Sequence, residues 1–419
     1  MESLLSSFLF FEIVFFLSHL IFFIYLYKKV SLPFAFFHPV QISFFFIFIT
    51  AYVPLKINFV FQHSYLLYEV PETYFYQVFS HYVIAQVLSY FSISLLDGSR
   101  KPVPHSNEII CNLPISPTVF LMLNVIPAIL LMFSFRADLI ALDFAQFSSN
   151  VKNNGNFWLL MLSLMIAILP AYHLLKEKRI SRSFYIYCFL ALLFVSFFGA
   201  RYVILTFAIS ILYVLVFFLK FKFKNVLPLF VVATSFFVII SFFRSNTVLE
   251  DNQALFLLAY FIRNNDFLFN SALPLYLYDI GSYSFFMGKT WIVDAFKIFQ
   301  PSYFFDKELS FFPSRFFYGS YASVDARTFN FGFFGRAFMD FGIIGFYILF
   351  IVFQLGYHFL LRIFREKKFS YLSSYLFAVL MFIKYPIFLL VGLNSHIISL
   401  VIIDCVFFLL PNALLNKKI

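Results

Sequence analysis

Long apolar runs separated by short polar connections dominate this chain. A membrane-spanning helix needs roughly 20 mostly apolar residues, and runs of this kind are centred near residues 16, 48, 87, 125, 165, 191, 210, 235, 345, 381 and 405. The pattern predicts an all-α polytopic membrane protein with about 11 transmembrane helices, in a range of roughly 10–12. The runs show no internal repeat, which lowers the expectation of a transporter built from duplicated halves.

Composition agrees with this interpretation. Of the 419 residues, 62% are apolar and 12% are charged, and the mean hydropathy is +0.90, whereas a soluble domain is about half apolar and a quarter charged. Phenylalanine alone occupies 71 positions, more than the core of a soluble protein could bury. The three cysteines, Cys111, Cys188 and Cys405, are far apart, so the sequence predicts neither a disulfide framework nor a thiolate metal site.

The formal net charge of +10 comes from short basic clusters between the apolar runs. This distribution argues against nucleic acid as a partner. Alternation of the spans places the clusters on one side, which the positive-inside tendency identifies as the cytoplasm; they lie at 28–29, 100–101, 176–182, 220–224, 362–368 and 417–418. The N-terminus then lies outside and the C-terminus in the cytoplasm. The first run lacks a basic n-region and is predicted to remain as an anchor.

One connection, residues 244–332 on the predicted outer side, is far longer than the others. It separates an eight-span bundle at 1–243 from a three-span bundle at 333–419, within what we expect to be a single membrane-embedded domain. The loop is too aromatic for disorder, so it should fold against the membrane. Its segment 288–300 has Trp291 and Ile292 at helical spacing with other apolar residues, which predicts an interfacial helix.

Arginines gather on the predicted outer side, against the positive-inside tendency. The guanidinium fork binds phosphate oxygens in pairs, which favours an anionic phosphate ligand there. These outer arginines are Arg136, Arg201, Arg244, Arg263, Arg315, Arg327 and Arg336. Arg201 is the strongest candidate for a phosphate ligand, because it lies in a very short turn between two apolar runs. It either points into an outward cavity that holds a lipid phosphate or snorkels to the headgroups.

A second polar cluster joins the long loop to the next span. If that helix begins near Phe333, Arg336 lies in its first turn and Asp340 lies one turn further on the same face, so the two can pair. The pair either lets two charges enter the membrane edge together, or leaves Arg336 for a phosphate and an aspartate as a general base. The two candidates for that base are Asp325 and Asp340.

Three further charges, Glu12, Lys384 and Asp404, fall within apolar runs. Lys384 and Asp404 lie at similar depth and are expected either to neutralise each other or to form a proton path. His81 and His396 lie near predicted outer helix ends. No metal-binding, P-loop or GxSxG motif is present, so we predict no metal and no cofactor.

The layout resembles that of the bacterial O-antigen polymerases, also called oligosaccharide repeat unit polymerases. The resemblance covers nearly the whole chain as architecture, with one large outer loop in the second half. Its specific segments are the turn Gly199-Ala200-Arg201 and the loop exit at 330–345, which ends in a Gly-x-x-Gly motif. The related ligases carry a His-Asn pair at the loop exit, whereas Phe329 precedes Asn330 here, so the identity of the base stays open.

This resemblance implies a fold of the lipid-dependent GT-C glycosyltransferase type and metal-independent glycosyl transfer at the outer face of the bacterial inner membrane. The donor would be a glycan on undecaprenyl pyrophosphate, and the acceptor would be one lipid-linked repeat unit. Charge on the departing pyrophosphate would be stabilised by Arg201, Arg327 and Arg336. Further contacts to the substrate are expected from Arg263, Arg315, Asn330 and His396.

The implied partners are the undecaprenyl-pyrophosphate-linked oligosaccharide and membrane lipid, with room for a chain-length regulator and a flippase. Two other functions compete with polymerisation. One is a flippase or transporter of the lipid-linked oligosaccharide, which predicts cationic residues in a central cavity at membrane depth. The other is a multi-span acyltransferase of surface sugars, for which the sequence offers no convincing histidine-based site.

Overall fold

The computed structural model describes seven continuous segments of the chain, residues 2–29, 38–56, 70–97, 116–136, 169–197, 267–296 and 332–365. It also describes the single positions 35, 166, 207, 208, 211, 212, 214, 215 and 235. Throughout these residues the regular structure is helical and no strand occurs. The predicted all-α class is therefore confirmed for the described part of the chain.

The helices of the described segments are as follows: α1 (Glu2–Lys29), α3 (Pro39–Ile47), the π-helix η1 (Phe48–Tyr52), α5 (Glu72–Asp97), α6 (Pro117–Ser134), α10 (Leu169–Glu177), α11 (Arg182–Phe197), α15 (Phe267–Asp279), α16 (Lys289–Phe296) and α20 (Gly332–Arg365). Local sequence explains several of their ends. His38 caps α3 and Pro39 opens it, while Ser116 and Pro117 do the same for α6. Proline suits the first helical position, since its missing N–H would have no intrahelical partner there.

Five described helices are long and apolar enough to cross a membrane: Phe8–Lys29, Pro39–Lys56, Glu72–Asp97, Pro117–Ser134 and Gly332–Phe359. They contain the predicted centres near 16, 48, 87, 125 and 345. The centre near 191 falls in a shorter apolar helix, Arg182–Phe194. The centres near 165, 210, 235, 381 and 405 lie outside the continuous described segments, so the total of eleven spans stays a prediction.

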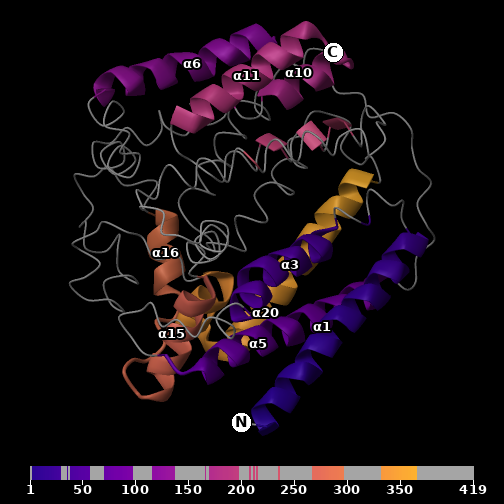
Figure 1. Ribbon diagram of the computed structural model, residues 1–419, viewed down its shortest axis with the longest axis vertical. Helices are drawn as coiled ribbons and strands as arrows, with labels where there is room; N and C mark the ends of the chain where they lie inside the picture. The colour runs from indigo at the N-terminus through magenta and orange to yellow at the C-terminus, as the bar shows by residue number, and fades with distance from the viewer. Residues whose placement is uncertain are drawn as a thin grey trace, which may run out of the picture.

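Helices α1, α3, α5 and α20 form one bundle, with α15 and α16 against one of its ends (Figure 1). We call that end the Arg336 end, because α20 begins there, beside α15 and the first turns of α5. At the opposite end, which we call the His38 end, α1 and α5 finish, α3 starts and the last turns of α20 arrive. This relative alternation agrees with the predicted topology. Which end faces the cytoplasm stays a prediction.

Phenylalanine fills the inside of this bundle and also covers its outside. Phe15 of α1 stacks on Phe44 of α3 with ring centroids 4.5 Å apart, and its edge meets Phe79 of α5 at 5.5 Å. On the outer surface of α1, Phe10 and Leu17 are more than half exposed. An apolar surface of this kind is stable in lipid and not in water. The five long apolar helices and this surface together indicate a membrane protein.

Helices α6, α10 and α11 form a second group (Figure 1). Helix α10 packs on both α6 and α11. Pro127 lies inside α6, where it removes one backbone donor from the helix, and such prolines are tolerated in membrane helices that find other partners for the freed carbonyl.

The long connection at 244–332 contains two described helices, α15 and α16. Helix α16, Lys289–Phe296, falls within the predicted helical segment 288–300 and confirms a helix over those eight residues. Ile292 is exposed, while Trp291 contacts the rings of Phe333 and Phe353 in α20. The segment is therefore held against the bundle through its tryptophan.

Candidate functional site

Two clusters of buried and partly buried polar side chains lie at opposite ends of the α1–α3–α5–α20 bundle. One surrounds Asp340 near the start of α20, where the sequence analysis places catalytic residues. The other surrounds His38, Asp97 and His358, which the sequence analysis does not single out. Each cluster joins segments that are far apart in the chain.

At the Arg336 end, the carboxylate of Asp340 is fully buried and binds α16. Its Oδ1 accepts a hydrogen bond from the backbone N–H of Thr290 at 3.3 Å, and its Oδ2 accepts one from the Thr290 hydroxyl. Thr290 is itself buried. The carboxylate therefore caps the N-terminus of α16, where backbone donors and the helix dipole favour a negative group.

A break in α20 makes room for this contact. Gly342 has φ +70°, which is not helical, so the carbonyls just before it lose their usual partners within the helix. The loop between α15 and α16 supplies replacements, because the amides of Phe286 and Met287 donate to the carbonyls of Met339 and Asp340 at 3.0 and 3.1 Å. The loop is thus fastened to α20 through its backbone as well as through Thr290.

The two glycines of the Gly-x-x-Gly motif have separate steric reasons. A Cβ at Gly342 would lie 2.9 Å from Cζ of Phe285, in addition to the unfavourable positive φ. A Cβ on Gly345 would collide with the Cβ of Phe341. Gly342 therefore lets the α15–α16 loop approach α20 closely, while Gly345 leaves room for Phe341 within α20.

Arg336 lies one helical turn before Asp340 and is half-buried. The two residues share one face of α20, as the i, i+4 spacing predicts, and the predicted ion pair between them stays a prediction. The first turn of α20 is also tied to α5, because the Phe334 amide donates to the Tyr82 hydroxyl at 3.1 Å. The backbone that carries Arg336 is in this way fixed to α5.

Aromatic rings cover this end of the bundle from the α15–α16 side. Tyr278 stacks on Phe285 with centroids 4.5 Å apart, and Tyr283 stacks on Phe286 at 5.4 Å. Burial raises the pKa of the Tyr283 hydroxyl well above its usual range, with the negative charge of Asp340 adding to the effect. Tyr283 is consequently a neutral hydroxyl at any physiological pH.

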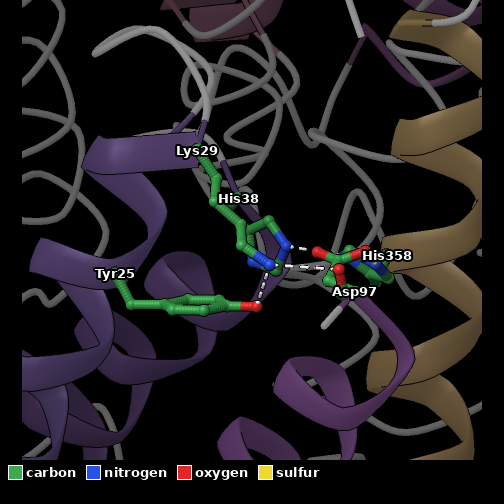
Figure 2. Close-up of polar contacts among 5 residues, drawn as sticks. All are labelled: Tyr25, Lys29, His38, Asp97 and His358. Atoms are coloured by element: carbon green, nitrogen blue, oxygen red, sulfur yellow. Dashed lines mark hydrogen bonds and ion pairs between the residues drawn. The ribbon is translucent and has the colours of Figure 1, made fainter. Parts of the chain in front are cut away.

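At the His38 end, two histidines and an aspartate form a hydrogen-bonded chain (Figure 2). Nε2 of His38 lies 2.9 Å from Nδ1 of His358, and Nε2 of His358 lies 3.3 Å from Oδ1 of Asp97. Lys29 donates to the Tyr25 hydroxyl at 2.6 Å and to the Asp97 carbonyl at 3.1 Å. The cluster therefore connects α1, α3, α5 and α20.

Backbone geometry fixes where the protons lie in this chain. The Val40 amide donates to Nδ1 of His38 at 3.3 Å, so that nitrogen carries a lone pair and the proton of a neutral His38 sits on Nε2. That proton points at Nδ1 of His358, which must accept it. The proton of His358 is then on Nε2 and is donated to Asp97. One arrangement of two neutral histidines satisfies every contact.

A second polar link between α3 and α5 lies further from the His38 end. Gln86, which is buried, donates to the Val40 carbonyl at 2.8 Å and accepts from the Ser43 hydroxyl at 2.8 Å. The Tyr90 hydroxyl accepts from Gln86 and contacts Nδ1 of His19. Val40 is held by α5 through a side chain that does not titrate, independently of His38.

Glu12, the intramembrane acid noted in the sequence, has a partner. Its carboxylate lies 2.6 Å from Nζ of Lys56, at the far end of the span that begins with α3. The Lys56 ammonium also lies 4.6 Å from the centroid of the Phe8 ring. Beside this pair, Glu12 and Tyr52 border an open apolar groove of about 470 Å³ along α1.

Of the predicted site residues, the structure describes Arg336 and Asp340, one turn apart on α20. The remaining ones lie outside the described residues: Arg201, Arg263, Arg315, Asp325, Arg327, Asn330 and His396. Lys384 and Asp404 lie outside them too. His81 is described, and its Nδ1 lies 2.6 Å from the Tyr347 hydroxyl of α20.

Sequence reasoning missed His38, Asp97 and His358. The signal that could have found them is topological, because each lies at a span end that the predicted alternation assigns to the same side. Within the described segments, no three side chains of His, Cys, Asp or Glu are placed to share a metal ion.

Over the residues that the structure describes, these observations define the class of the protein as a helical membrane protein with polar clusters at both ends of one bundle. Comparison of the chain with models of known families, with characterised proteins and with solved structures finds no match. The function is therefore argued from the residues themselves.

Proposed function

We propose that this protein polymerises undecaprenyl-pyrophosphate-linked oligosaccharide repeat units into O-antigen or another surface polysaccharide. The reaction would be a metal-independent glycosyl transfer at the outer face of the bacterial inner membrane. The observation that supports the proposal is the position of Arg336 one turn before Asp340 on α20, the helix on which α15 and α16 pack. The apolar outer surface of the bundle suits a substrate that carries a long lipid.

The chemistry asked of Arg336 is electrostatic. An acceptor hydroxyl attacks the anomeric carbon of the donor glycan, the bond from that carbon to the pyrophosphate oxygen breaks, and undecaprenyl pyrophosphate leaves with the electron pair. A guanidinium aimed at the departing phosphates stabilises their growing negative charge. Arg201 and Arg327 are proposed to act with Arg336 on the same group.

The proton of the acceptor hydroxyl needs a base, and the contacts of Asp340 favour Asp325 for that role. Asp340 already accepts two hydrogen bonds from Thr290, so it would have to release α16 before it could accept a proton from a sugar. We therefore assign Asp340 to positioning Arg336 and α16. Arg263, Arg315, Asn330 and His396 are proposed to contact the sugars or phosphates.

The decisive experiment examines the surface polysaccharide of cells that lack this gene. A single capped repeat unit on the lipid acceptor is expected, because repeat units would still be made and exported but not joined. Complete absence of repeat units at the surface would indicate a flippase instead. An unchanged polymer ladder, or polymer that lacks only an acyl group, would contradict polymerisation.

Complementation with arginine variants then tests the site. Arg336→Lys keeps the charge and loses the fork that grips two phosphate oxygens, so polymer should be lost while protein level stays normal. Arg201→Lys and Arg327→Lys should behave in the same way. The matched control is Arg362→Lys, which makes the same exchange near the opposite end of α20 and should restore the full ladder. Full ladders from all three outer variants would remove the phosphate argument.

A further inference from the structure

The chain Val40–His38–His358–Asp97 holds two neutral histidines in a single proton arrangement, and it reaches from α3 to α5 and α20 (Figure 2). Each lone pair on the imidazole nitrogens is already used. A proton that joins the chain must therefore displace one hydrogen bond. Histidine is the side chain that ordinarily changes charge in the physiological pH range, so the question is which bond is lost.

Two outcomes are possible in principle. In the first, His358 takes the proton on Nδ1 while His38 keeps its own on Nε2, so two N–H groups face each other across 2.9 Å. In the second, the proton lands on Nδ1 of His38, and the Nε2 proton of His38 moves to Nδ1 of His358. His358 is then an imidazolium that donates to both His38 and Asp97, and the bond from the Val40 amide to His38 is lost.

The relative strengths of the hydrogen bonds favour the second outcome. It keeps one charge-assisted hydrogen bond between the rings and a second to the Asp97 carboxylate, and such bonds are roughly twice as strong as neutral ones. It gives up one long neutral bond from a backbone amide. The first outcome gives up the bond between the rings and adds repulsion between two donors.

We propose that the His38–His358–Asp97 chain is a proton-operated switch for the first turn of α3. Without the extra proton, His38 caps α3 and the chain is neutral apart from Asp97. With it, the cap opens, while the contact from α20 to α5 becomes a full ion pair between His358 and Asp97. This switch goes beyond the proposed glycosyl transfer and does not depend on it.

Three charged groups lie near the switch. Asp97 of α5 is the negative group and contacts His358 directly. Lys29 of α1 is a positive group bonded to the Asp97 carbonyl and to Tyr25, and Arg362 lies one turn beyond His358 on α20. The ring of Phe22 lies against His38 with centroids 6.1 Å apart and adds no charge.

Amide exchange measures the switch directly. The amides of Val40, Gln41 and Ile42 all donate to His38, the first to its ring and the other two to its carbonyl. Full-length protein in lipid nanodiscs would be followed by hydrogen–deuterium exchange with mass spectrometry, corrected for intrinsic exchange. Between about pH 7.5 and about pH 5.5, we expect exchange of this turn to rise about twofold to thirtyfold, the factor that loss of an N-cap gives.

Matched variants identify the chain as the cause. His38→Asn keeps a side-chain oxygen that can cap α3 but does not titrate, so the rise should vanish. Asp97→Asn keeps an acceptor for His358 and removes the negative charge, so the rise should move to lower pH. His81→Gln alters a histidine of α5 that contacts Tyr347 instead and should leave the rise in place.

Two results would overturn the switch. One is constant protection of the turn across the pH range in the unaltered protein, and the other is an equal rise in His38→Asn. If His38→Asn does not fold, nitrogen-15 spectra of histidine in the unaltered protein decide the matter. They should show an unprotonated Nδ1 on His38 at neutral pH and an N–H there in acid, and an Nδ1 that stays unprotonated would refute the proposal.

Discussion

The Arg336 end and the His38 end each contain one carboxylate, buried for Asp340 and partly buried for Asp97, and they use it in opposite ways. Asp340 accepts hydrogen bonds from the amide and the hydroxyl of Thr290, two donors that do not change charge near neutral pH. Asp97 ends a chain of two histidines that can change charge. A carboxylate saturated by permanent donors fastens segments together, whereas one coupled to imidazoles can respond to protons. The first end is therefore expected to be rigid and the second adjustable.

Removing the Asp340 carboxylate tests the rigid end and has the largest expected effect. In Asp340→Ala, the buried Thr290 amide and hydroxyl lose their acceptor, and Arg336 loses the carboxylate whose charge it faces. The free energy of unfolding should fall by about 2–6 kcal/mol, because two buried donors are left without an acceptor at about 1–3 kcal/mol each. Chemical unfolding in detergent measures it. Asp340→Asn, which keeps one acceptor oxygen, should lose less, and equal losses would contradict the hydrogen-bonding argument.

The kink at Gly342 is the next test of rigidity. Gly342→Ala places a Cβ against Phe285 on a residue with φ +70°, and the loss should be about 1–3 kcal/mol from backbone strain and displacement of the ring. Gly356→Ala is a control on the same helix, because a Cβ there meets nothing within 4 Å. It should be neutral or stabilising by up to about 1 kcal/mol. Similar thermal unfolding of both variants would show that the kink is not needed.

At the adjustable end, loss of a single acceptor should cost less. Asp97→Ala removes the partner of His358 but leaves Lys29 bonded to the backbone carbonyl of residue 97. A destabilisation of about 1–2 kcal/mol is expected for one hydrogen bond to a carboxylate. Thermal unfolding at neutral pH checks it. A loss as large as that of Asp340→Ala would erase the contrast between the two ends.

The smallest effect is expected from the Glu12–Lys56 pair, which lies toward the Arg336 end but faces outward. The Lys56 side chain is 42% exposed, so the pair is only partly removed from its surroundings. Replacing both charges together, with Glu12→Gln and Lys56→Met, should change the free energy of unfolding by less than about 1 kcal/mol. A loss beyond that range, measured in the same unfolding assay, would place this pair among the buried clusters.

The predictable part of the fold is the part that depends on near neighbours in the chain. Apolar runs located the five described spans, and helical spacing placed Arg336 and Asp340 on one face of a helix that begins at Gly332. The helix at Lys289–Phe296 followed from the same periodicity. In each case the deciding contacts lie within one or two turns.

The unpredicted part depends on which helices are neighbours. Thr290 and Asp340 are 50 residues apart, and His38 and His358 are 320 apart. Hydropathy predicts the depth of a residue in the membrane but not the helix that it contacts, so the sequence did not predict the contact of Thr290 with Asp340. The contact between His38 and His358 was equally unpredictable, since each residue has the sequence surroundings of an ordinary residue at the end of an apolar run.

Packing of Trp291 against Phe333 and Phe353 has a practical consequence. The chain contains two tryptophans, so Trp158→Phe would leave a single indole whose emission comes from α16. Its spectrum should be blue while α16 rests on α20 and should shift to the red when water reaches the ring. Fluorescence from one side chain would then report, in real time and inside a bilayer, whether α16 is packed on α20.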